Sequence, residues 1–194
     1  MKNIKLAIIA LFTLVSVYSV SAQDSNNPWA ISVGFNTVDT YDTGGESTEF
    51  FRDYAGPGDW NFLSTISRIT VERYLEDGFT LQLAGSLNRI TQVNLPDDAS
   101  LLHKSIDLNL KYNLDAFVAA IFGNSTKYFS PFAYAGAGYT SLDGEGEAML
   151  NYGFGVNFWA TDGVGFVYQA GTKEQLSDVV PSHYYHSIGI LFKL

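Results

Sequence analysis

The stretch Ser105-Ile-Asp-Leu-Asn-Leu-Lys-Tyr-Asn-Leu114 alternates strictly between polar and apolar residues. Successive side chains of a β-strand point to opposite faces of the sheet, so this pattern predicts a strand with one apolar and one polar face. The polar face carries charges of both signs, Asp107 and Lys111. The fold therefore depends on which of the two faces is turned away from water.

The same period of two recurs along most of the chain beyond residue 22, and no segment shows a convincing amphipathic helix. It predicts eight strands of about nine to twelve residues. We place them at 29–36, 68–75, 79–88, 105–114, 132–139, 150–158, 165–170 and 184–194. The segment 132–139 is so rich in Ala and Gly that its faces stay unassigned.

Composition excludes several classes of protein. The 194 residues include 46% hydrophobic, 15% aromatic and only 16% charged residues, with a net charge of −9. One compact domain fits this length, and disorder does not fit such a composition. An acidic chain is not expected to bind nucleic acid, because its negative charges repel the phosphates. The absence of cysteine excludes disulfides, thiolate metal sites, thiol catalysis and a lipid-modified N-terminal cysteine.

The first 22 residues have the organisation of a secretory signal peptide. Lys2 and Lys5 precede an apolar run that is short for a membrane span, and Val20-Ser21-Ala22 places small residues before a cleavage site. We therefore expect a signal peptide over 1–22, cleaved after Ala22, and a single domain over 23–194.

The connections between the predicted strands alternate in length. Short Asp-Gly turns are expected at 76–78 and 161–163. Longer polar connections are expected at 37–63, 94–102, 143–147 and 174–183. The connection 115–130 is long where a short turn is due, and its apolar run 116–122 fits either a short interfacial helix or an overlong strand end.

Three features favour an apolar face that points outward into a membrane. The polar face pairs opposite charges, it is rich in small residues that suit a narrow lumen, and short turns alternate with long loops. Aromatic residues near strand ends add candidates for interfacial girdles, namely Trp29, Tyr74, Phe79, Tyr112, Tyr139, Trp159 and Tyr184. The predicted fold is all-β: an eight-stranded antiparallel up-and-down transmembrane β-barrel. A soluble lipocalin-like ligand binder is the alternative fold.

Four stretches resemble OmpA-like outer-membrane barrels of Bacteroidetes-type bacteria. They are 28–39, 67–79, 131–139 and the ending His186-Ser-Ile-Gly-Ile-Leu-Phe-Lys-Leu194. The resemblance covers essentially all of the mature chain and implies a barrel in the outer membrane with both termini in the periplasm. We expect the barrel domain only, without the C-terminal peptidoglycan-binding domain of larger relatives. The sequence ends in Leu194 where such barrels usually end in Phe.

The interior charges are the first candidate site. Arg68, Glu72, Asp107 and Lys111 all lie on the polar phase. An eight-stranded barrel is just filled by its own side chains, so a structural salt-bridge cluster is expected. The alternative is a narrow ion pore gated by exchange of partners within this cluster.

A lipid-modifying outer-membrane enzyme is a further alternative. His103, His183 and His186 fall near loop rims, and Ser105 and Ser187 lie close to two of them in the sequence. Adjacent strand positions point to opposite faces, which argues against His186 acting with Ser187. We expect no catalytic residue, no metal site and no cofactor.

The long connections are the second candidate site. They hold most of the acidic residues: Asp39, Asp42, Glu46, Glu49, Asp53, Asp59, Asp97, Asp98, Asp143, Glu145, Glu147, Glu174 and Asp178. These fit either a solvated, repulsive surface or a cation-binding surface, although no calcium-loop motif is present. The first connection also holds Phe50, Phe51, Tyr54 and Trp60, which fit either an interaction patch or a lid over the barrel mouth.

The sequence thus predicts a non-enzymatic outer-membrane barrel with a structural or surface-interaction role carried by its loops. The expected partners are outer-membrane lipid or lipopolysaccharide and the barrel-assembly machinery. A surface protein or a cation is a further possible partner, and nucleic acid is not one.

Overall fold

The structure is a computed structural model, and it describes residues 25, 27–39, 60–91, 100–122 and 128–194. The predicted signal peptide and the loop residues Phe50, Phe51 and Tyr54 lie outside these residues.

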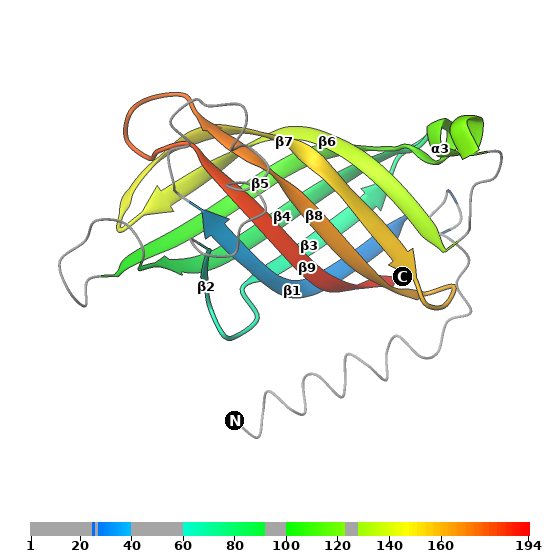
Figure 1. The fold of residues 1–194 in the computed structure, drawn as a ribbon, viewed down its shortest axis with the longest axis horizontal. Coiled ribbons are helices and arrows are strands. Elements are labelled where there is room, and N and C mark those ends of the chain that lie inside the picture. The colour runs from blue at the N-terminus through cyan, green and yellow to red at the C-terminus, as the bar shows by residue number, and fades with distance from the viewer. Residues whose placement is uncertain (1–24, 26, 40–59, 92–99, 123–127) are drawn as a thin grey trace, which may run out of the picture.

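The described residues form one antiparallel sheet that closes on itself (Figure 1). Its elements are β1 (Trp29–Asp39), β2 (Asn61–Phe62), β3 (Arg68–Tyr74), β4 (Phe79–Ile90), β5 (Leu101–Asn113), α3 (Asp115–Phe122), β6 (Phe129–Leu142), β7 (Glu145–Trp159), β8 (Val164–Gln175) and β9 (His183–Lys193). Each long strand pairs with the next along the chain, and β1 pairs with β9 from Ala30↔Lys193 to Asp39↔Tyr184. The two-residue β2 only extends the edge of β1, so eight strands make the barrel, as predicted.

The apolar face points outward. In β5, the apolar side chains of Ile106 and Leu108 are 56% and 51% exposed. The charged side chains of Asp107 and Lys111, on the other face of the same strand, are only 2% and 3% exposed. The outer wall of the other strands is apolar in the same way. An apolar exterior around a polar, filled interior is the arrangement of a transmembrane barrel, and closure leaves no unpaired strand edge in lipid. This confirms the predicted face assignment and rules against a lipocalin-like interior.

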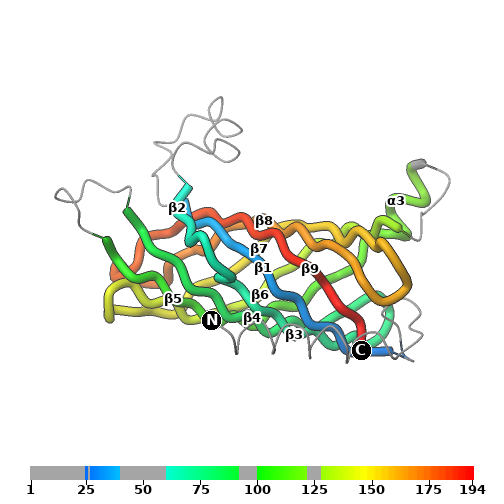
Figure 2. The backbone as a smooth tube through the Cα atoms, turned by 90° about the horizontal axis from the view of Figure 1, so that it is seen from below, coloured from blue at the N-terminus to red at the C-terminus, as the bar shows by residue number. Residues whose placement is uncertain are grey.

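The two rims differ, as Figures 1 and 2 show. We call the rim that carries the tight turns 75–78 and 160–163, α3 and the C-terminus the turn rim. We call the opposite rim, with the turn 143–144 and the loop 176–182, the loop rim. The expected long connection at 143–147 is wrong. Asp143 and Gly144 form a tight turn with φ of +50° and +100°, and Glu145 and Glu147 already belong to β7.

The apolar run 116–122 is a helix rather than an overlong strand end, because it lies within α3, which spans Asp115–Phe122. In the described part of the chain, no helix is long and apolar enough to cross a membrane. The strand predicted at 132–139 extends over 129–142, and the one predicted at 165–170 continues to Gln175.

The strand phase assigns the faces of β6 and corrects the predicted girdle position of Trp159. Phe132 and Tyr134 of β6 point into the barrel and are 3% and 4% exposed. Trp159 is also buried, because it has the inward phase of β7, so it does not belong to an outer girdle. Outward-pointing Trp29, Phe79, Tyr112 and Tyr139 remain exposed near the strand ends, which is the position of interfacial aromatic residues.

Candidate functional site

The first interior ion pair lies toward the turn rim. Lys111 Nζ donates to Glu72 Oε1 and Oε2 at 2.9 and 2.8 Å, and both side chains are buried. The Lys111 ammonium also lies 3.9 Å from the centre of the Phe132 ring. A buried ion pair persists only when hydrogen bonds complete it. Gln82 supplies one of these, because its Nε2 donates to Glu72 Oε1 at 2.8 Å.

The second interior pair lies toward the loop rim and involves a residue that the sequence analysis missed. Lys173 Nζ donates to Asp107 Oδ1 and Oδ2 at 2.7 and 2.9 Å. Arg68 Nη1 lies 4.0 Å from Asp107 Oδ2. Lys173 falls beyond the strand predicted at 165–170. It continues the inward phase of Val167 and Gln169, and that continuation was the signal that could have identified it.

Amide side chains connect the two pairs along the barrel. Asn151 Nδ2 donates to Asp107 Oδ1 at 3.1 Å and to Asn109 Oδ1 at 3.3 Å, and Asn109 Nδ2 donates to Gln82 Oε1 at 3.1 Å. Since Gln82 also bonds Glu72, a continuous polar chain runs from Lys111 to Lys173. The predicted interior charges therefore do not form a single cluster. They form two groups, Lys111 with Glu72, and Arg68 and Lys173 with Asp107, which the amide side chains join into one network. We call this set of side chains the interior network.

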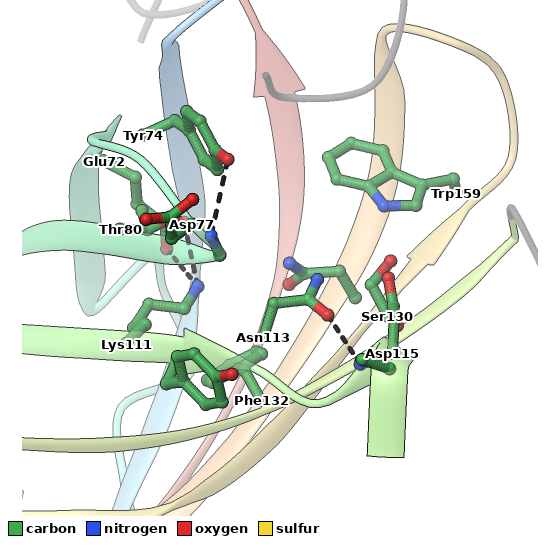
Figure 3. Close-up of a pocket in the computed structure, with 14 residues that line it drawn as sticks. Glu72, Tyr74, Asp77, Thr80, Lys111, Asn113, Asp115, Ser130, Phe132 and Trp159 are labelled. Atoms are coloured by element: carbon green, nitrogen blue, oxygen red, sulfur yellow. Dashed lines mark hydrogen bonds and ion pairs between the residues drawn. The ribbon is translucent and has the colours of Figure 1, made fainter. Parts of the chain in front are cut away.

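A cavity of about 430 Å³ opens at the turn rim and ends at Lys111 and Glu72 (Figure 3). At its mouth, Asp115 N donates to Asn113 Oδ1 at 2.6 Å and Gly78 N donates to the Tyr74 hydroxyl at 3.4 Å. Partial burial raises the pKa of Asp115, which lies outside the strands. Farther in, a small cavity lined by Arg68, Gln82 and Gln169 holds only about 10 Å³. The described residues thus fill the middle of the barrel, and the open space belongs to one end.

Glu147 organises the loop 176–182 at the loop rim. Its carboxylate accepts hydrogen bonds from the backbone N–H of Leu176, Ser177, Val179 and Val180, all between 2.8 and 3.0 Å. The Ser177 hydroxyl adds a fifth bond at 2.8 Å. Glu147 is 6% exposed and Asp39, in β1, is 2% exposed. For these two acids the expected solvated, repulsive surface is wrong, because one serves as a loop anchor and both are buried.

The histidines lie on different faces. His103 and His183 are inside the barrel at the loop rim, with their Nε2 atoms 3.3 Å apart. His186 is on the outer wall, where its Nδ1 lies 2.8 Å from the Tyr168 hydroxyl and its ring stacks on Trp60 at 4.6 Å. Trp60 therefore packs against the barrel wall. Its role in the predicted loop patch stays a prediction, because the other three patch residues lie outside the described part of the chain.

The serines considered for catalysis have other partners. Ser105 Oγ is 2.6 Å from Ser86 Oγ and donates to Asp107 Oδ2 at 3.3 Å. Ser187 Oγ donates to the carbonyl of Gln169 at 3.3 Å, on the face opposite to His186. Within the described ranges, no three histidine, aspartate or glutamate side chains gather as metal ligands would.

Comparisons with known proteins place the fold among outer-membrane barrels. No family model and no curated protein matches this chain. The structure is similar to that of Neisserial surface protein A, with a TM-score of 0.57 and 13% identity over 86% of this chain and 97% of that one. It is also similar to OprG of Pseudomonas aeruginosa, with a TM-score of 0.55 and 14% identity over 90% and 97% of the chains.

The N-terminal β-barrel domain of OprF from the same bacterium gives a TM-score of 0.54 and 14% identity, over 87% of this chain and 98% of that domain. At such low identity these likenesses concern the fold alone. They agree with the eight-stranded barrel that the resemblance to OmpA-like proteins implied.

Proposed function

We propose that this chain is a non-enzymatic β-barrel of a bacterial outer membrane, related to OmpA-like barrels, with a structural or surface-interaction role carried by its loop rim. The observation that carries the proposal is the apolar outer wall around the filled interior network. Such a wall is stable in lipid and unstable in water, and the filled lumen leaves the loops as the exposed polar surface. The tight turns at the other rim favour placing that rim and both termini in the periplasm.

The proposed partners follow from this location. The wall contacts outer-membrane lipid or lipopolysaccharide, and the barrel-assembly machinery inserts the chain. The anchored loop 176–182 and the acidic first and second connections are the surface offered to a further protein or cation partner.

Cell fractionation with a heat-modifiability gel tests the location. The mature protein is expected in the outer-membrane fraction, and the unboiled sample should migrate differently from the boiled one because a closed barrel resists detergent. Recovery in the soluble periplasm without a mobility shift would overturn the proposal. Mass spectrometry of the purified mature chain tests cleavage after Ala22.

A narrow ion pore is the second candidate function. The observation that favours it is that two cations face the same carboxylate. Arg68 Nη1 lies 4.0 Å from Asp107 Oδ2, and Lys173 Nζ lies 2.7 Å from Asp107 Oδ1. Two cations that share one carboxylate can exchange places, and such an exchange would alter the width of the lumen. Single-channel recording of the wild type and of Arg68→Ala tests this candidate. If neither conducts, the pore is excluded.

A further inference from the structure

Strands β3, β4 and β5 run side by side in the barrel (Figure 1). Their outward side chains leave a groove on the outer wall. It exists because Gly85 occupies an outward position of β4, between the outward side chains of Leu83 and Leu87. A Cβ atom at Gly85 would meet no other atom within 4 Å. Ile69 and Ile106, the partners of Gly85 in the neighbouring strands, form the sides. The groove encloses about 590 Å³, and apolar side chains line most of it.

A pair of cations lies at the loop-rim end of this groove. Lys104 lines the groove, pairs with Leu87 and points outward in the phase of Ile106. Arg89, two residues beyond Leu87 on the same face, is its diagonal neighbour. Diagonal neighbours of antiparallel strands lie within the reach of long side chains. Arg89 Nη1 donates to Ser100 Oγ at 3.2 Å, which holds the guanidinium near the rim.

The distribution of basic residues makes this pair distinctive. Among the described residues, Arg68, Lys111, Lys173 and Lys193 are buried in the lumen. Arg73 points outward at the turn rim, over the Trp29 ring. Lys104 and Arg89 are thus the outward cations of the loop-rim half in the part of the chain that the structure describes. They stand at the end of an apolar groove in a protein whose net charge is −9.

We propose that this groove is a specific lipid site: one acyl chain lies in the space beside Gly85, and Lys104 and Arg89 bind the phosphate of the same lipid. An acyl chain fits because the groove faces the hydrocarbon and its sides are aliphatic. A phosphate fits because cations near a membrane surface attract anionic headgroups by about 1 kcal/mol each, which corresponds to about a fivefold change in affinity. The inference rests on the membrane location proposed above.

Native mass spectrometry of the full mature barrel in detergent tests the site. The probes are a long-chain phosphatidic acid, the diacylglycerol with the same chains, and inorganic phosphate. We expect the wild type to retain one phosphatidic acid, to bind diacylglycerol weakly, and to keep its lipid when inorganic phosphate is added. Gly85→Leu should abolish retention because its side chain fills the groove, and Gly85→Ala should reduce it partly.

The two cations are tested by Lys104→Gln and Arg89→Gln, each of which should weaken binding about fivefold. Arg73→Gln is the matched control, since it removes an outward cation at the other rim, and it should bind like the wild type. A heat-modifiability gel shows that each variant is folded. Gly85→Leu is expected to fold because the space at Gly85 is open.

Four results would overturn the lipid site. They are unchanged retention in folded Gly85→Leu, equal binding of diacylglycerol, displacement of the lipid by inorganic phosphate, and a dimer mass that Gly85→Leu abolishes. The last would assign the groove to a second copy of the chain. Failure of the membrane location itself is recognised separately, because the wild type would then be soluble and show no mobility shift.

Discussion

At the scale of single residues, the interior network determines how far a substitution inside the barrel lowers the free energy of unfolding. Lys111 and Glu72 are buried together, and each relies on the other for most of its compensation. A buried charge that loses its partner is strongly destabilising, whereas a neutral replacement of both partners is often tolerated.

We predict that Lys111→Met lowers the free energy of unfolding by about 3–5 kcal/mol, because Glu72 is left with Gln82 as its remaining donor among the interactions described above. The free energy of unfolding should fall less in the double variant Lys111→Met/Glu72→Gln than in Lys111→Met alone. Urea unfolding in lipid vesicles measures both. If the loss of free energy in the double variant equalled the sum of the losses in Lys111→Met and Glu72→Gln, the two residues would not be a coupled pair.

At the scale of elements, one side chain of β7 holds a loop that connects β8 and β9. Four backbone N–H groups and one hydroxyl converge on the Glu147 carboxylate. A carboxylate accepts at both oxygens, while an amide offers one acceptor and one donor.

Glu147→Gln is therefore expected to release part of the loop 176–182 without opening the barrel. Hydrogen exchange should become faster at the amides of Leu176, Ser177, Val179 and Val180, and the strand amides should stay protected. Glu145→Gln is the control, because Glu145 is exposed on the same strand. Equal exchange in the two variants would mean that Glu147 does not anchor the loop.

At the scale of the whole molecule, the apolar wall predicts how the barrel responds to charge. Leu108 lies in the outward phase near the middle of β5, and Tyr112 lies in the same phase near the turn rim. The cost of a lipid-facing cation is greatest at the centre of the bilayer and small near its surface.

Leu108→Arg should thus destabilise the barrel in lipid vesicles by about 2–4 kcal/mol, and Tyr112→Arg by no more than about 1 kcal/mol. Equilibrium unfolding from vesicles measures the difference. In a barrel surrounded by water both substitutions would be harmless, so equal stability of the two variants would contradict the transmembrane arrangement.

The strand period, the eight strands and the direction of the apolar face could all be predicted from the amino-acid sequence. These follow from local alternation, and charges such as Asp107 and Lys111 on the polar phase decide the direction. The predicted phase also placed Arg68, Glu72, Asp107 and Lys111 together inside.

Which side chains pair with one another became known only from the folded barrel, because closure brings together strands that are far apart in sequence. Lys173 reaches Asp107 from 66 positions away, and Glu147 meets a loop about 30 positions later. The groove at Gly85 likewise depends on side chains of two neighbouring strands. Alternation along one strand carries no information on such partners, since register and closure are set by the packing of the whole sheet.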